Sequence, residues 1–87
     1  MTSAHPSTQS DARVVVLTRQ GCHLCEEALA TIETVCRERG VPWQAVDVDG
    51  DPELKRRYTD HVPVTFVDGR QLGMWFVDAG QLAAALG

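Results

Sequence analysis

Two cysteines separated by two residues are the part of this sequence best suited to chemistry. They form the run Cys22-His23-Leu24-Cys25, which follows a β-branched stretch and a glycine, where a strand would lead into a helix. Free backbone N–H groups and the positive end of the helix dipole stabilise a thiolate at such a position. We therefore predict that Cys22 is a nucleophile, with a thiol pKa below the ordinary value of about 8.5.

The second cysteine of the pair lies one helical turn further along the same side of the expected helix. From there it can attack a mixed disulfide formed at Cys22, so we predict that Cys25 is the resolving thiol. An imidazolium at His23 would favour the Cys22 thiolate, and we expect this residue to tune the pair, with direct proton transfer as the alternative. The spacing thus indicates thiol–disulfide exchange.

A structural zinc site is the other common use of two closely spaced cysteines, and it requires two further ligands. Cys36 follows Cys25 by 11 residues, which corresponds to roughly 16 Å along a helix and is too far for a shared metal. Outside the tail of residues 1–12, only His61 remains as a candidate beside His23. We therefore predict no metal at the pair, and we expect Cys36 to fill the core as a small apolar side chain.

Composition and length narrow the class of protein. The chain has 87 residues, 44% of them hydrophobic, and a net charge of -4, which suits one small domain and argues against binding to nucleic acid. The longest apolar run, residues 14–17, is too short to span a membrane. The first residues have no leader-like pattern, and three cysteines fit a catalytic pair in a reducing compartment. We expect a cytoplasmic monomer with a disordered tail over residues 1–12 and one domain over residues 13–87.

Hydrophobic patterning predicts seven elements around these thiols. The first half has a strand at Arg13–Thr18, a helix from Cys22 to Gly40 and a strand at Trp43–Val48. The second half has a short helix from Asp51 to about Asp60, a strand at Val64–Val67, an Asp68-Gly69 turn, a strand from Arg70 to about Trp75, and a helix capped by Asp78 and ending at Leu86. The order β-α-β-α-β-β-α predicts an α/β fold with a four-stranded mixed sheet covered by three helices.

These features resemble the glutaredoxin and thioredoxin superfamily, above all its short glutaredoxin-like branch. The likeness spans about residues 14–86 and rests on the cysteine pair after the first strand, Val62-Pro63 before the hairpin, and Phe66-Val67-Asp68 followed by Gly73. The resemblance implies a minimal thioredoxin fold. It also implies a cis proline across from the cysteines, with Val62 and Pro63 docking the substrate.

The same resemblance assigns further residues to substrate binding. Arg19 stands where glutaredoxins often hold a glutathione carboxylate, and Gly73 takes the place of the first glycine of their glutathione cradle. Met74 replaces the second glycine and Asp78 is displaced by one position, so the cradle is altered here. Trp75 and Phe76 can form an apolar docking rim, or one of them can pack into the core. His61 is expected near the cysteines, as a base or as a solvated loop residue.

Residues and resemblance together favour an enzyme, a thiol–disulfide oxidoreductase that reduces protein or low-molecular-weight mixed disulfides. We expect no bound cofactor, and an external reductant such as glutathione or another thiol. A second reading is a binding protein that holds an iron–sulfur cluster through Cys22 with the help of glutathione. A third is a redox-inert interaction module that has kept only the fold.

Overall fold

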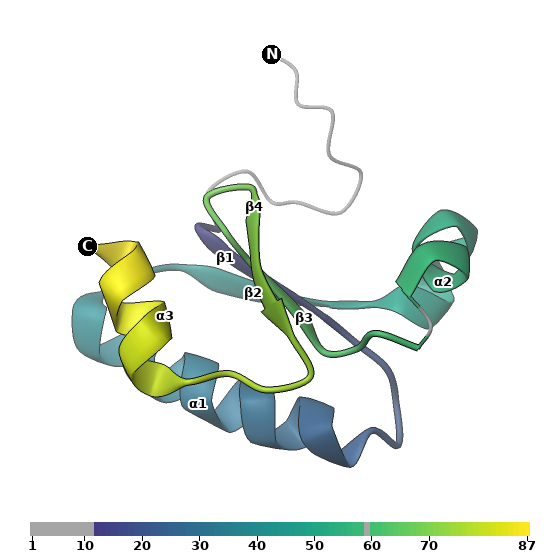
Figure 1. The fold of residues 1–87 in the computed structure, drawn as a ribbon, viewed down its shortest axis with the longest axis horizontal. Helices are drawn as coiled ribbons and strands as arrows, with labels where there is room; N and C mark the ends of the chain where they lie inside the picture. Colours follow the sequence, from purple (N-terminus) through teal and green to yellow (C-terminus); the bar gives the residue numbers. More distant parts are fainter. Residues whose placement is uncertain (1–11, 59) are drawn as a thin grey trace.

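The computed structural model describes residues 12–58 and 60–87, which form one mixed sheet flanked by helices (Figure 1). The tail predicted over residues 1–12 lies outside the described residues, apart from Ala12. The elements along the chain are β1 (Val14–Thr18), α1 (His23–Arg39), β2 (Trp43–Asp47), the 3₁₀ turn η1 (Val48–Gly50), α2 (Pro52–Tyr58), β3 (Val64–Val67), β4 (Arg70–Met74) and α3 (Ala79–Leu86).

The four strands lie in the order β2-β1-β3-β4, with β1 parallel to β2 and antiparallel to β3. The strands β3 and β4 form an antiparallel hairpin. Sheet and helices match the predicted α/β class and the predicted order, with η1 as the one addition. A right-handed β-α-β unit followed by a hairpin is therefore the frame that carries the cysteines.

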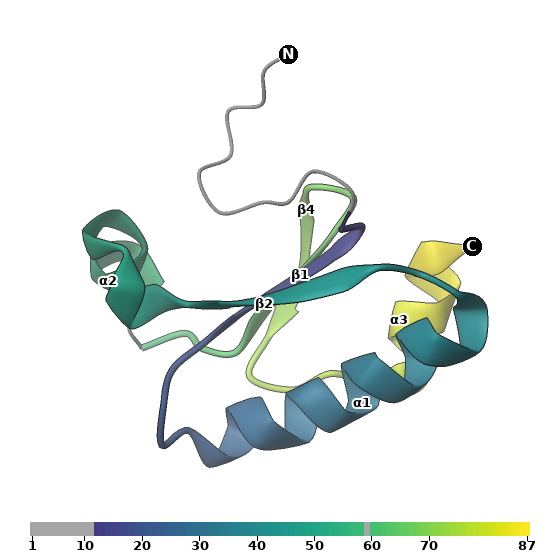
Figure 2. The same ribbon diagram turned by 180° about the vertical axis from the view of Figure 1, so that it is seen from behind.

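The central strand β1 is buried on both faces, as its continuous run of apolar residues predicts. Val14 and Val16 are fully buried in a core beneath α1 and α3, while Leu17 belongs to a second core on the α2 side. Figures 1 and 2 show α1 and α3 lying together and α2 well apart from them. The first core contains Val14, Val16, Ile32, Val35, Cys36, Val67, Leu82 and Leu86, and the second contains Leu17, Val48 and Val64.

The hairpin turn follows from the predicted Asp-Gly pair. Asp68 and Gly69 both have positive φ, 51° and 85°, which is the two-residue turn whose twist suits a hairpin. Arg13 fastens this turn to the rest of the molecule through two hydrogen bonds, from Nε to Asp68 Oδ1 at 2.9 Å and from a terminal nitrogen to Oδ2 at 2.8 Å. These bonds lower the pKa of the Asp68 carboxyl and raise the pKa of the Arg13 guanidinium.

The structure corrects the sequence predictions for the end of the second strand and for the burial of Trp75 and Phe76. The second strand ends at Asp47 instead of Val48, because Asp47 Oδ1 accepts the Asp49 N–H at 2.9 Å and starts the 3₁₀ turn. The packing of Trp75 or Phe76 into the core was also wrong, since their exposed fractions are 46% and 71%. No helix among the described residues is long and apolar enough to cross a membrane.

Candidate redox site

Cys22 is the N-cap of α1, the position from which a side chain can reach the free N–H groups of the first turn. Gly21 precedes it with φ 74°, a left-handed conformation that turns the chain from β1 into the helix. The Cys22 backbone is extended, with φ −98° and ψ 109°, and its Sγ accepts a hydrogen bond from the Cys25 N–H at 3.1 Å. A donor and a helix dipole directed at one sulfur both favour its thiolate form.

Cys25 lies in the first turn of α1 with only 2% of its surface exposed, and it forms a disulfide with Cys22. The two Cα atoms are 5.1 Å apart, within the range that a disulfide spans. Cys22 is half-buried, so the pair consists of one partly exposed cysteine and one buried cysteine. This is the arrangement expected of an attacking thiol and a resolving thiol.

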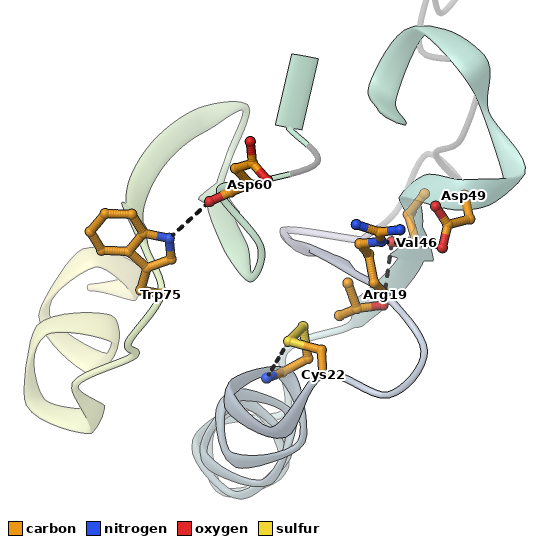
Figure 3. Close-up of a disulfide and its surroundings, with 8 residues drawn as sticks. Arg19, Cys22, Val46, Asp49, Asp60 and Trp75 are labelled. Atoms are coloured by element: carbon orange, nitrogen blue, oxygen red, sulfur yellow. Dashed lines mark hydrogen bonds and ion pairs between the residues drawn. A yellow bond between two sulfur atoms is a disulfide. The ribbon is translucent and has the colours of Figure 1, made fainter. Parts of the chain in front are cut away.

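Two clusters flank the cysteines, one on each side (Figure 3). On one side the Arg19 guanidinium forms an ion pair with Asp49, with Nε and Oδ2 3.3 Å apart. On the other side the Trp75 indole N–H donates to the Asp60 carbonyl at 3.3 Å. The charge of Arg19, the predicted substrate-binding residue, is therefore shared with a carboxylate that sequence reasoning missed.

The proline loop faces the end of β4. The Val62–Pro63 peptide bond is cis, as the resemblance implied, and Pro63 is buried while Val62 packs against the second core. The Pro63 carbonyl accepts the Trp75 N–H at 2.7 Å. Gly73 pairs with Thr65 in the β3–β4 register, and a Cβ built on it would meet no atom within 4 Å. Gly73 is therefore not required by crowding in this structure.

The two histidines near the site differ in their partners. The His23 imidazole is 82% exposed and lies 3.1 Å from the Glu27 carboxylate one turn further along α1. His61 is exposed, and its ring meets the Tyr58 ring edge-on at 6.5 Å. Among the contacts of residues 12–58 and 60–87, none joins either imidazole to a cysteine sulfur. In the same part of the chain, no three potential metal ligands gather in a cluster.

Comparison with protein families agrees with this geometry. Residues 13–87 match the family described as a glutaredoxin-like domain (DUF836). The chain belongs to this glutaredoxin-like family. An uncharacterised protein of Mycobacterium tuberculosis is 34% identical over 80 residues, which cover 86% of this chain and 82% of the relative.

Solved structures place the glutaredoxin-like chain in the thioredoxin fold. A Nitrosomonas europaea protein solved by solution NMR is 31% identical, covers 97% of this chain and 96% of its own, and has a TM-score of 0.69. An X. campestris protein solved by X-ray crystallography is 32% identical, with 84% and 93% of the two chains covered and the same TM-score. Thioredoxin 1 of Thermosipho africanus, 13% identical with 84% and 88% covered, has a TM-score of 0.61 and shares the fold.

Sequence reasoning missed a shallow groove beside the cysteine pair of this glutaredoxin-like protein. Its lining comes from α1 and from the connection between β4 and α3, namely Leu24, Glu27, Ala28, Thr31, Trp75, Phe76 and Val77. The four residues from α1 follow the spacing of one helix face, which was a usable signal. The connection gave no such signal, because its position over that face depends on contacts distant in sequence.

Proposed function

We propose that this protein is a thiol–disulfide oxidoreductase that uses Cys22 as the nucleophile and Cys25 as the resolving thiol. The observation that carries the proposal is the half-buried Cys22 at the N-cap of α1, whose sulfur accepts the Cys25 N–H and is bonded to the sulfur of the buried Cys25. Membership in a glutaredoxin-like family supports the same chemistry.

The reaction consists of two exchanges between sulfur atoms. The Cys22 thiolate attacks one sulfur of a substrate disulfide, the substrate S–S bond breaks, and one substrate thiolate leaves as a mixed disulfide forms. The Cys25 thiolate then attacks the Cys22 sulfur and releases the second substrate thiolate. The substrate gains two electrons and, in water, two protons, and the protein is left with the Cys22–Cys25 disulfide. An external thiol or dithiol must return the two electrons.

The decisive experiment measures disulfide reduction by the pre-reduced protein and three cysteine variants. Cys22→Ser should abolish reduction of both a protein disulfide and a glutathione mixed disulfide, because no nucleophile remains. Cys25→Ser should still form a mixed disulfide but fail to release the reduced protein substrate. Cys36→Ser is the matched control and should keep both activities. Reduction by Cys22→Ser at the rate of the unmodified protein would refute the proposal.

A further inference from the structure

The groove beside the cysteine pair has an apolar side that is exposed to solvent. It begins at Leu24, inside the cysteine motif, and continues along α1 opposite the connection from β4 to α3, which runs close to that helix (Figures 1 and 2). Phe76 lines it with 71% of its surface exposed, and Trp75 with 46%. Neighbouring large apolar side chains that stay exposed on one surface are typical of a surface that binds a partner.

The backbone that presents Phe76 is held in a strained shape. Trp75 has φ 73°, a conformation rare for a bulky residue, and the Phe76 N–H donates to the Met74 carbonyl at 2.9 Å to close a three-residue turn. Two hydrogen bonds anchor this turn to the loop before β3. The Trp75 backbone N–H donates to the Pro63 carbonyl, and the Trp75 indole N–H donates to the Asp60 carbonyl. Such strain persists only where surrounding contacts enforce it, and it concentrates at functional sites.

The charge on the groove is negative. Glu27 is its only charged lining residue among those the structure describes, and its carboxylate is 61% exposed, with the His23 imidazole 3.1 Å from one oxygen. Asp78 follows the lining residue Val77, and its carboxylate accepts the Gly80 N–H at 3.0 Å as the N-cap of α3. None of the arginines that pair with carboxylates lines the groove; these are Arg13, Arg19, Arg37 and Arg56. Such a groove favours a cationic group and disfavours the carboxylates of glutathione.

From these observations we infer that the groove binds the polypeptide segment next to a substrate disulfide, with an apolar side chain against Phe76 and a lysine or arginine against Glu27. The inference rests on the proposed function and names its substrate class as apolar–basic protein segments rather than glutathione. Glu27 follows Cys22 by five residues, roughly 7.5 Å of helix rise. An extended peptide covers this distance in two or three residues at about 3.3 Å each. The basic residue therefore stands two or three positions from the reacting cysteine.

The test uses peptides with one cysteine, blocked as the mixed disulfide with 2-mercaptoethanol, in single turnovers of the pre-reduced protein. The flanking positions carry Phe or Ser and Lys or Glu in all four combinations. We expect Phe to raise the second-order rate constant about tenfold over Ser, from burial of its ring. Lys should raise it about two- to fivefold over Glu, as for an exposed ion pair.

Two pairs of variants assign these preferences to residues. Glu27→Gln should remove the preference for Lys and Glu27→Lys should invert it, whereas Glu26→Gln, the same change one residue earlier and outside the groove lining, should leave it intact. Phe76→Ser should remove the preference for Phe, and Met74→Ser, also exposed but outside the lining, should not.

A small neutral disulfide, bis(2-hydroxyethyl) disulfide, tests disulfide reduction separately from peptide binding, because it is too small to fill the groove. If the protein reduces it through Cys22 but all four peptides react alike, the groove inference is overturned and the proposed function stands. If the pre-reduced protein reduces neither the peptides nor this small disulfide, the proposed function is refuted. A glutathione mixed disulfide that reacts faster than the Phe–Lys peptide also overturns the inference, as does a dimer in size-exclusion chromatography that Phe76→Ser converts to monomers.

Discussion

The two ends of α1 each carry a cysteine, and their settings are opposite. Cys22 caps the N-terminal end, half-buried, with a backbone N–H directed at its sulfur. Cys36 lies near the C-terminal end with 1% of its surface exposed, packed among the side chains of the first core. Burial raises the pKa of the Cys36 thiol, and the negative end of the helix dipole acts in the same direction. The same residue type is therefore a half-buried helix cap at one end and a buried core side chain at the other.

The local chain accounts for much of this contrast. Before Cys22, Gly21 has a positive φ and turns the chain, so that Cys22 precedes the first helical residue with an extended backbone. After Cys36, Gly40 has φ 66°, and the Val41 N–H returns to the Cys36 carbonyl at 2.9 Å, so the helix end closes over the core. The difference teaches that position along a helix and depth in the fold, rather than the thiol itself, determine the surroundings of each cysteine sulfur.

The largest expected difference is in thiol reactivity. In the reduced native protein at pH 7, iodoacetamide should modify Cys22 at least about a thousandfold faster than Cys36, because Cys36 reacts only after the core opens. Mass spectrometry of peptides after timed quenching measures both rates. In denaturant the two rates should become similar, which serves as the control. Equal rates in the native protein would contradict the contrast between the helix ends.

The next effect concerns the stability of the core. Cys36→Ser should lower the free energy of unfolding by about 1–3 kcal/mol, since a hydroxyl replaces a weakly polar thiol where no water reaches. Chemical denaturation of the oxidised protein measures the loss, and Cys36→Ala, which buries no polar group, should be the milder change. Disulfide reduction by the folded variant should be unchanged. A folded Cys36→Ser protein without activity would show that Cys36 serves the reaction.

Alkaline pH should lower the free energy of unfolding through the same residue, Cys36. The folded-state pKa of the Cys36 thiol is raised, so above its unfolded pKa of about 8.5 the unfolded chain releases a proton that the folded chain keeps. The free energy of unfolding should therefore fall as pH rises past this value, and fall less in Cys36→Ala. Denaturation curves of both oxidised proteins at pH 7, 8.5 and 10 provide the measurement, and parallel losses would contradict it.

The smallest expected effect is at Thr65, on the strand that follows the proline loop. Its side chain is 2% exposed, and its Oγ1 has no hydrogen-bond partner among the residues described. Thr65→Val should stabilise the protein by about 1 kcal/mol, because it removes an unsatisfied hydroxyl at almost constant volume. Thr34→Val, the same change at an exposed position of α1, is the control. A stabilised Thr65→Val protein with reduced disulfide reduction would show that the hydroxyl serves the reaction and is not merely an unsatisfied group in the core.

Elements governed by short-range sequence signals were predictable. The strand β3 has its predicted bounds, and Asp51 Oδ1 accepts the Glu53 and Leu54 N–H groups at 2.9 and 3.3 Å, as expected of a residue that starts α2. A β-bulge between Thr65 and Phe66 was not predicted, since it depends on how β3 and β4 adjust to each other. Short-range signals thus located the elements without fixing how they meet.

By itself, the sequence determined that the cysteine pair would stand at the start of a helix, which turn would join the hairpin and that Cys36 would be buried, because each depends on neighbours within about one helical turn or one β-turn. The tertiary structure decided that Asp49 shares the charge of Arg19, that Trp75 adopts a positive φ, and that Phe76 and Glu27 line one groove. These contacts join segments distant in sequence, and they arise only when packing of the two cores brings those segments together.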